Sequence, residues 1–565
     1  MAPIIQIRGL LYSYRRQKDR PALLGVDLDV SEGEFIAIAG RAGSGKSTLC
    51  YALNGLIPHS FGGHMEGEVI VCGLNTRTTS VPDLARHVGF VLQNAESQLV
   101  GLSVEEDTAF GLENIALPPH EINSRVNAAL QTVRLQDHGR SSPWTLSGGQ
   151  KQRLAIAAAL AFQPQVLVLD NPTAELDPVG KQEVMATIAQ LNRERGVTVV
   201  IVNQELEEVL PYASRLVLMD RGQITTVGCP AEVIDSAEEV LKVGVKLPDV
   251  AQIAYELRIK NKWIGPLPLA VSDALDQMRR LESPGIAAVE TAATDKRAES
   301  LIEVHDASFS YPNGKRVIHN VSLTIRRGEF IALMGPNGAG KTTLAKHFNG
   351  LLVPTSGRVL IGGKDSRSTG VAQLASTVGY VFQNPDHQLF SRTIADEFAF
   401  GPKNLGWSKD RIANAVQRAL EYLGGRQRGS DDPYFMGLAE RKLIAIASVL
   451  IMEPEVLVLD EPATGADHEA SLRIMDYLSA LHRQGLTVVI VTHDVSLAAN
   501  YADRVVVVRE GSVALDGRPD EVFRKTTELQ SCLVTPPQVA RLAQALNPSA
   551  FTCRVGELVD QLAGA

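Results

Sequence analysis

The stretch GRAGSGKST occupies residues 40–48, and a close copy, GPNGAGKTT, occupies residues 335–343. Both fit the pattern G-x-x-x-x-G-K-[ST], and each follows an apolar segment, EFIAIA or EFIALM, that predicts a short β-strand. In such a loop the glycines let consecutive backbone N–H groups point at phosphate oxygens, and the following helix adds its positive N-terminal end. The sequence therefore predicts two phosphate-binding loops, each between a strand and a helix.

The residues of these loops are the first candidates for binding a nucleotide. Lys46 and Lys341 are expected to reach the β- and γ-phosphates, and Ser47 and Thr342 to ligate magnesium. The complete sets are Gly40, Arg41, Ala42, Gly43, Ser44, Gly45, Lys46, Ser47 and Thr48 in the first copy, and Gly335, Pro336, Asn337, Gly338, Ala339, Gly340, Lys341, Thr342 and Thr343 in the second.

The two loops belong to a repeat that runs through the whole chain. GFVLQNAESQL (89–99) recurs as GYVFQNPDHQL (379–389), and SVEEDTAFGLEN (103–114) recurs as TIADEFAFGPKN (393–404), in the same order. Both halves also contain continuous apolar runs, such as TVVIVN and TVVIVT, that suit a parallel sheet covered by helices on both faces. The sequence therefore predicts a tandem duplication of one α/β domain.

Composition limits the classes of protein that fit. A chain of 565 residues is too long for one hydrophobic core, and a net charge of −9 argues against a general nucleic-acid binder. The five cysteines lack metal-ligand spacing, so we expect reduced thiols in a cytosolic protein. We expect no secretory signal, and the apolar runs are shorter than the roughly 20 residues of a membrane span. Any work at a membrane is therefore expected to go through partner proteins.

Two acidic strand ends differ in the residue that follows. Asp170 and Asp460 close apolar strands, where a carboxylate can hold magnesium through water. The next residue is Asn171 in the first half and Glu461 in the second. Glu461 is a candidate general base for an attacking water, whereas the neutral Asn171 cannot accept that proton. General-base assistance is typically worth roughly 10² to 10⁴-fold in rate.

The block LSGGQ (146–150), taken with these motifs and with Gln93 and Gln383 in their QN contexts, resembles the ATP-binding cassette (ABC) ATPases across both halves. The resemblance implies an α/β fold with two P-loop NTPase domains in tandem, and it implies ATP and Mg²⁺ as cofactors. In that family two cassettes pair head to tail, so each ATP lies between the phosphate loop of one and the LSGGQ of the other. An intramolecular pair of this kind is expected here.

The resemblance also assigns roles to single residues. Tyr14 and Tyr311 match the adenine-stacking aromatic, and His493 matches the switch histidine, whose place Gln204 takes in the first half. The implied catalytic residues are Glu461, His493 and Gln383. The implied magnesium ligands are Ser47, Gln93, Asp170, Thr342, Gln383 and Asp460. The implied nucleotide contacts outside the loops are Tyr14, Gln93, Ser147, Gly148, Gly149, Gln150, Asn171, Gln204 and Tyr311.

The second half lacks a normal copy of the LSGGQ block. Gly437, within MGLAERK (436–442), stands as far before Asp460 as Ser147 stands before Asp170. The hydroxyl expected to donate to the γ-phosphate is therefore missing, Leu438 replaces a glycine, and Glu440 brings a negative charge. Head-to-tail pairing places this segment, Asn171 and Gln204 in one composite site. We expect that site to hold ATP and the other site, with Glu461 and His493, to hydrolyse it.

Tandem cassettes without membrane spans serve several functions. QNPDHQLF (383–390) and the block 393–404 look like those of energy-coupling factor (ECF) transporters, which import vitamins and transition metals, and KLPDVAQIAYEL (246–257) and TPPQVARLAQAL (535–546) resemble their helical tails. This resemblance implies a transmembrane coupling subunit, a membrane substrate-binding subunit, and a location at the cytoplasmic face of the membrane. The region just after Gln93 and Gln383 is the expected docking surface.

Three other classes remain open on the sequence. A fused ATPase of a ribose-type sugar importer has a similar length but is expected to lack the helical tails. A translation-associated cassette protein would have a long charged linker, and a repair or chromosome-type ATPase would have a coiled coil or a zinc insertion. The predicted domains are residues 1–235 and 301–527, with helical extensions at 236–283 and 528–565 and a linker at 284–300.

Overall fold

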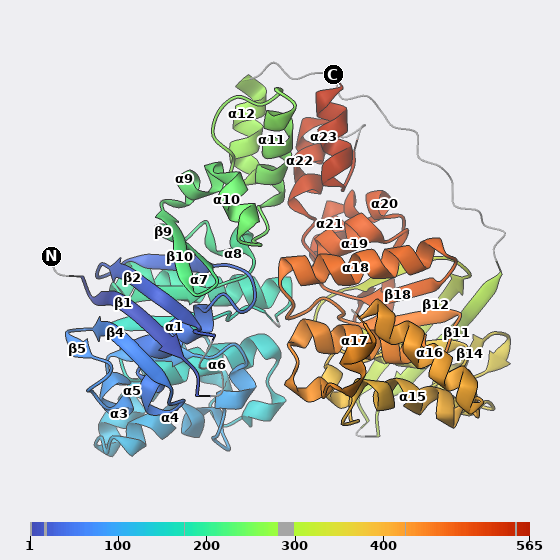
Figure 1. The fold of residues 1–565 in the computed structure, drawn as a ribbon, viewed down its shortest axis with the longest axis horizontal. Helices are drawn as coiled ribbons and strands as arrows, with labels where there is room; N and C mark the ends of the chain where they lie inside the picture. The colour runs from blue at the N-terminus through green and yellow to red at the C-terminus, as the bar shows by residue number, and fades with distance from the viewer. Residues whose placement is uncertain are drawn as a thin grey trace. The chain divides into compact units, whose positions relative to one another are not determined.

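The computed structural model describes residues 3–15, 20–174, 176–280, 299–312, 314–423, 425–547 and 551–564. The chain forms two compact units, Met1–Ser283 and Pro284–Ala565, coloured blue to green and yellow to red in Figure 1. Most of the expected linker, 284–300, lies outside the described residues; its last residue, Ser300, begins strand β11 (Ser300–Ser310).

The first unit is built on a six-stranded sheet that is parallel except at one edge. Its strands, in spatial order, are β10 (Gln223–Gly228), β9 (Arg215–Asp220), β3 (Phe35–Ala39), β8 (Thr198–Val202), β7 (Val166–Asp170) and β6 (Val88–Val91). Only β10 runs antiparallel to its neighbour. Every residue of β3, β7 and β8 is buried, as expected for central strands that are covered on both faces.

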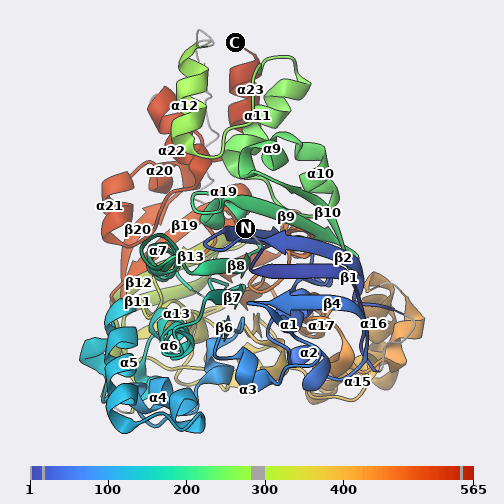
Figure 2. The ribbon, with the colours of Figure 1, turned by 90° about the vertical axis from the view of Figure 1, so that its left-hand side faces the viewer.

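An antiparallel sheet lies beside the parallel one in this unit (Figure 2). Its order is β2 (Leu23–Val30), β1 (Ile5–Ser13), β4 (His64–Val71) and β5 (Leu74–Asn75). The apolar side chains of β1 and β4 join those of β3, β7 and β8 in one core cluster, so the two sheets share a core.

The helices of the first unit carry local sequence signals for their ends. Asp177 accepts a hydrogen bond from the Gly180 amide at 2.8 Å and caps α7 (Pro178–Arg195), and Gly196 ends that helix in the left-handed conformation.

The longer helices of the first unit are α1 (Lys46–Leu53), α4 (Val104–Asn114), α5 (Pro119–Thr132), α6 (Gly148–Leu160), α7, α11 (Asp249–Ile259) and α12 (Val271–Arg280). Short helices are α2 (Leu56–His59), α3 (Val81–Leu84), η1 (Ala95–Gln98), α8 (Leu206–Val209), α9 (Pro230–Asp235) and α10 (Ala237–Lys242).

The second unit repeats both sheets. The mixed sheet has the order β16 (Val378–Val381), β17 (Val456–Asp460), β18 (Thr487–Val491), β13 (Phe330–Met334), β19 (Arg504–Arg509) and β20 (Ser512–Gly517). The antiparallel sheet has the order β12 (Arg316–Arg326), β11, β14 (Ser356–Ile361) and β15 (Lys364–Asp365). Along β13, Phe330 and Ala332 point into one core cluster and Ile331 into another, so both faces of the sheet are covered.

The helices of the second unit follow the order of those in the first, although α2 has no counterpart in the described chain. They are α13 (Lys341–His347), α14 (Val371–Leu374), η4 (Pro385–His387), α15 (Ile394–Asn404), α16 (Lys409–Tyr422), α17 (Leu438–Leu450), α18 (His468–Arg483), α19 (Val495–Tyr501), α20 (Pro519–Phe523), α21 (Thr526–Ser531), α22 (Gln538–Leu546) and α23 (Val555–Ala563). Val534, Ala540 and Cys553 of the C-terminal extension belong to the same core cluster as Phe330, so the extension packs on its own unit.

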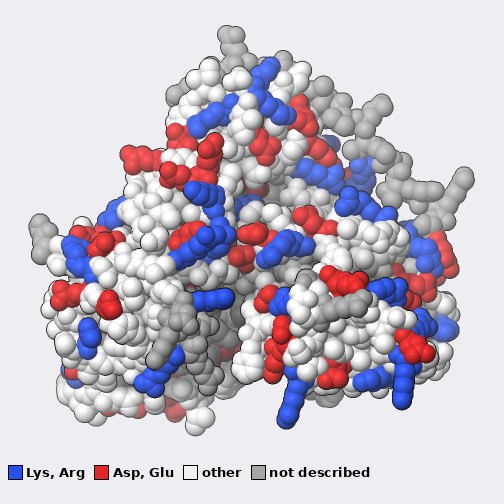
Figure 3. Space-filling model, in the orientation of Figure 1, with Lys and Arg blue, Asp and Glu red and all other residues white. Residues whose placement is uncertain are grey.

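The surface carries mixed charges. On the face drawn in Figure 3, basic and acidic side chains of the described residues are interspersed, and uncharged surface separates them. This pattern agrees with the modest net charge of −9.

Candidate nucleotide sites

Both predicted phosphate loops lie between a buried strand and a helix. Gly45 and Gly340 stand at the N-cap positions of α1 and α13 with φ of 100° and 101°, a conformation that few residues other than glycine adopt. A Cβ atom at Gly335 would lie 2.1 Å from the carbonyl oxygen of Val508, so no side chain fits there. The loops thus depend on glycine both for their turn and for their close approach to the neighbouring strand.

The lysine of each loop points back along its own loop. Nζ of Lys46 donates to the carbonyls of Gly40 and Arg41, both at 2.7 Å. Nζ of Lys341 donates to the carbonyls of Gly335 and Pro336, at 2.8 and 3.0 Å. Both lysines are buried, and each ammonium group lies against the carbonyls of its own glycine-rich loop. This arrangement fits an anionic phosphate chain.

In the second unit, the hydroxyl and the carboxylate expected to bind magnesium are in contact. Thr342 Oγ1 donates to Asp460 Oδ1 at 3.1 Å, and the hydroxyl of Tyr380 donates to Asp460 Oδ2 at 3.2 Å. Burial raises the pKa of Asp460, and these two hydrogen bonds partly offset that rise. A hydroxyl beside a carboxylate is the oxygen donor set that Mg²⁺ prefers, so the residues fit this cation.

The first unit has a similar pair. Burial raises the pKa of Asp170, and a hydrogen bond from Ser47 and the charge of Lys46 partly offset it. Phe90 stands where the second unit has Tyr380, so this carboxylate lacks the phenol contact. Gln93 and Gln383 follow β6 and β16 and are exposed. Among the described residues, no hydrogen bond joins either glutamine to its aspartate.

Glu461 is joined directly to His493. Nδ1 of His493 lies 3.0 Å from Oε1 of Glu461, and Thr464 donates to the other carboxylate oxygen at 2.9 Å. Burial opposes ionisation of Glu461, but His493, Thr464 and Lys341 outweigh it and hold its pKa below the ordinary value. The carboxylate is therefore ionised at neutral pH, as a proton acceptor must be.

The first unit links the same two segments differently. The side chains of Asn171 and Gln204 share no hydrogen bond within the described chain. Instead, Glu208 Oε2 accepts from Thr173 Oγ1 at 2.6 Å and from Asn203 Nδ2 at 3.0 Å. Lys181 pairs with the same Glu208 at 2.7 Å. A neutral pair thus occupies the position of Glu461 and His493, and the partly buried Glu208 beside it joins the two segments through Thr173 and Asn203.

The LSGGQ segment and its counterpart differ in how they start a helix. Ser147 Oγ accepts from the Gln150 amide at 3.3 Å, and Gln150 Oε1 accepts from the Ser147 amide at 2.9 Å, which is a complete capping box on α6. At α17 the cap is Gly437, which makes no side-chain bond. Glu440 forms a salt bridge with Arg428 instead, with 3.1 Å between its Oε1 and Nη2 of the arginine.

The tyrosines expected to stack on adenine stand beside the phosphate loops. The hydroxyl of Tyr14 lies 3.1 Å from Thr48 Oγ1, and that of Tyr311 lies 3.2 Å from Thr343 Oγ1. Each ring also meets a neighbouring aromatic ring edge-on, with centroids 4.9 Å apart. The structure therefore places both tyrosines at the same point of their loops.

Comparison with known proteins identifies the two units. The model of the ABC transporter family matches residues 23–174 and 318–464. The chain belongs to this family. An ABC transporter ATP-binding protein of Caldanaerobacter subterraneus is 39% identical over 549 residues, which cover 96% of each chain. A second, from Methanosarcina mazei, is 38% identical over 561 residues, or 97% of this chain and 94% of the relative.

One solved structure has a comparable identity over a single unit. CbiO1 of Clostridium perfringens, part of the ABC transporter complex CbiONQ, is 36% identical and covers 41% of this chain and 94% of its own length, with a TM-score of 0.38. Because the family model matches both units, the protein is a tandem ABC ATPase, and ABC ATPases bind and hydrolyse ATP, generally with Mg²⁺.

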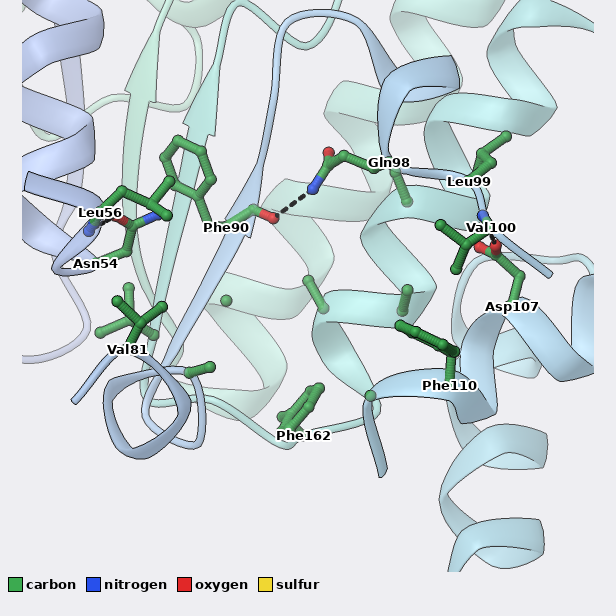
Figure 4. A pocket seen from close by; sticks show the side chains of 17 residues that line it. Asn54, Leu56, Val81, Phe90, Gln98, Leu99, Val100, Asp107, Phe110 and Phe162 are labelled. Atoms are coloured by element: carbon green, nitrogen blue, oxygen red, sulfur yellow. Dashed lines mark hydrogen bonds between the residues drawn. The ribbon is translucent and has the colours of Figure 1, made fainter. Parts of the chain in front are cut away.

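The ABC ATPase has a groove just beyond Gln93. It is a cavity of about 260 Å³ in the first unit. Figure 4 shows Phe90, Val100, Phe110 and Phe162 around it, with Gln98 donating to the Phe90 carbonyl at 3.2 Å. Val100 and Phe110 are 60% and 49% exposed. The groove therefore offers apolar surface to solvent.

The second unit has a related surface beyond Gln383. Phe390 and Phe400 take the places of Val100 and Phe110, are 64% and 47% exposed, and meet edge-on with ring centroids 4.7 Å apart. Glu397 fixes the loop by accepting from the amides of Phe390 and Ser391, at 3.1 and 2.8 Å. Both units of the ABC ATPase therefore expose large apolar side chains at this point.

Three contributors to the second site are absent from the sequence prediction. Tyr380, Thr464 and Lys442 contact Asp460 or Glu461, yet the sequence analysis assigns none of them a role. Comparing the repeats would have pointed to Tyr380, because GFVLQN becomes GYVFQN.

No helix among the described residues is long and apolar enough to cross a bilayer.

Proposed function

We propose that this ABC ATPase energises an ECF-type importer through one hydrolytic and one non-hydrolytic ATP site. The observation that carries the asymmetry is the direct contact between Glu461 and His493, against the uncharged pair Asn171 and Gln204. An ionised carboxylate can accept a proton from water, and an amide cannot. The two units thus share the same kind of phosphate loop, but only the second unit has a side chain that can act as a general base.

The two composite sites follow from head-to-tail pairing of the units. The hydrolytic site combines Glu461 as general base, His493 as its partner and Gln383 near the metal with the intact LSGGQ of the first unit. Its phosphate loop is 335–343, its magnesium ligands are Thr342, Asp460 and Gln383, and Tyr311 stacks on adenine. The other site combines the loop 40–48, Tyr14, Ser47, Gln93, Asp170, Asn171 and Gln204 with residues 436–440 and retains ATP.

The chain's own residues perform each step of hydrolysis in this proposal. Lys341 and the loop amides hold the phosphates, and Thr342 and Asp460 would hold Mg²⁺, which would supply positive charge to the phosphate chain. Glu461 takes a proton from the attacking water, and His493 keeps that carboxylate ionised and oriented. Ser147, at the start of α6, donates to the γ-phosphate from the other side.

Membrane partners would dock on the exposed apolar surfaces beyond the two glutamines. The groove around Phe110 suits an apolar helix of a transmembrane coupling subunit, and Phe390 and Phe400 offer a second such contact. The imported vitamin or metal would be bound by a separate membrane subunit, and the ATPase would stay peripheral at the cytoplasmic face.

Copurification tests the transport assignment. The tagged chain should be recovered from membranes with a small integral protein, and Phe110→Glu with Phe400→Glu should abolish that recovery while ATP binding persists. The control replaces Val227, which is 42% exposed on β10 at the sheet edge opposite β6, with Glu and should leave recovery unchanged. Sedimentation with ribosomes and no membrane partner would reject the proposal. Recovery with a large sugar permease would favour the ribose-type importer.

A further inference from the structure

Lys442 joins two segments of the second unit that are distant in sequence. It lies in the first turns of α17, it is 5% exposed, and its Nζ donates to the backbone carbonyl of Glu461 at 2.8 Å. Glu461 has a φ of +51°, in the left-handed region that is costly for a residue with a Cβ. The ammonium group therefore holds the residue whose backbone is strained at the end of β17.

The first unit shows what the same position looks like without the charge. Gln152 takes the place of Lys442, is 3% exposed, and its Nε2 has no hydrogen-bond partner among the described residues. Asn171, the counterpart of Glu461, has a φ of +52°, nearly the same as that of Glu461. A neutral side chain therefore fits the space, and the fold of this segment does not require an ammonium group.

The two units differ at both positions together. In the second unit, which has Glu461 after the strand, the buried residue on the helix is a lysine; in the first unit, which has Asn171 there, the residue at the same helix position is a glutamine. A buried charge is stable only when another charge or hydrogen bond compensates it. Burial lowers the pKa of Lys442 to about 8, against the pull of Glu461 and Asp460, so the side chain still carries its charge at neutral pH. The charged lysine thus occurs in the unit that has the carboxylate of Glu461, and its charge is compensated there.

We infer that Lys442 is a positioning residue for ATP hydrolysis, which fixes the backbone of Glu461 so that its carboxylate faces His493 and the attacking water. The inference rests on the role proposed above for Glu461. Lys442 does not touch the phosphate loop, so it acts on turnover and leaves ATP binding unchanged. It also ties Glu461 to α17, whose N-cap Gly437 is the counterpart of Ser147 in the LSGGQ segment.

The test compares three variants of the full chain with its membrane partners. Lys442→Gln copies the first unit and should fold; it should lower kcat about 10- to 100-fold, the effect of losing one charged hydrogen bond, while the KM for ATP stays within about twofold. Lys442→Arg should restore at least about a third of the rate because it keeps the charge and the donor. Gln152→Met, in the first unit, is the matched control and should leave kcat unchanged.

The outcomes separate this inference from the proposal on which it rests. Glu461→Gln is assayed in parallel: if it keeps normal hydrolysis, the role of Glu461 is wrong. If Glu461→Gln is inactive while Lys442→Gln has normal kcat, the inference about Lys442 alone is overturned. It is also overturned if Lys442→Gln and Lys442→Arg lose the same activity, or if equilibrium binding of a fluorescent ATP analogue weakens in parallel with kcat.

Discussion

Nδ1 of His493 lies 3.0 Å from Oε1 of Glu461, so the end of β17 and the end of β18 are joined by one charged contact. In the first unit the corresponding join runs through Glu208, which accepts from Thr173 and Asn203. The same two segments are held together in both units. Only the second unit places a carboxylate and an imidazole at the join, where a water could lose its proton.

Replacing Glu461 with Gln should lower kcat for ATP by roughly 10² to 10⁴-fold, because the amide cannot accept a proton from water. Binding of ATP should persist, since the phosphate loop is unchanged. The measurement is steady-state hydrolysis together with equilibrium binding of a fluorescent ATP analogue. Asn171→Ala is the matched control and should change kcat by less than about twofold; equal losses in both variants would contradict the asymmetry.

The repeat made much of the fold predictable. Two copies of each strand and loop, such as EFIAIA before Gly40 and EFIALM before Gly335, indicate the same α/β architecture twice, and the comparisons confirm it. The contact of Lys442 could not be predicted, because its position beside Glu461 depends on packing between a helix and a strand end that are 19 residues apart in sequence. No local pattern reports such a contact.

His493→Gln gives the second unit the residue of the first. The variant should lose the hydrogen bond to Glu461 and lower kcat about tenfold or more, within the range for a lost charged hydrogen bond. Gln204→His should not raise kcat, because Asn171 remains unable to act as a base. An unchanged rate in His493→Gln would show that Glu461 works without its imidazole partner.

Ser147→Ala removes the capping box of α6 and should lower the free energy of unfolding of the first unit by about 1 kcal/mol. Gly437→Ala is the matched substitution at α17. Gly437 makes no side-chain hydrogen bond that could be lost, and nothing in the described structure lies within 4 Å of the added Cβ. The free energy of unfolding of this variant should therefore stay within about 0.5 kcal/mol of the unsubstituted protein. Urea unfolding, monitored by hydrogen exchange in each unit separately, measures the change in the free energy of unfolding for both variants. Equal effects would mean that the cap contributes nothing.

A histidine–aspartate pair makes the second unit sensitive to pH. His482 Nε2 lies 3.2 Å from Asp503 Oδ2, and this hydrogen bond raises the pKa of His482 above its ordinary 6.5 despite burial. Burial would raise the pKa of Asp503, but hydrogen bonds from His482 and from the Phe330 amide hold it below 3.8. The first unit has Asn192 and Ser214 at these positions, and Ser214 Oγ accepts from the Phe35 amide at 3.2 Å.

The sign of the pH effect follows from these directions. The contribution of His482 is complete below about pH 6.5 and is lost as the pH rises through its raised pKa, while that of Asp503 is lost only below pH 3.8. Because Asp503 is 47% exposed, the loss should be only roughly 0.2–1 kcal/mol. Hydrogen exchange of β13 between about pH 6 and 8, corrected for the intrinsic rate, should show it. His482→Asn with Asp503→Ser, which copies the first unit, should flatten this dependence; an unchanged slope would assign it to other groups.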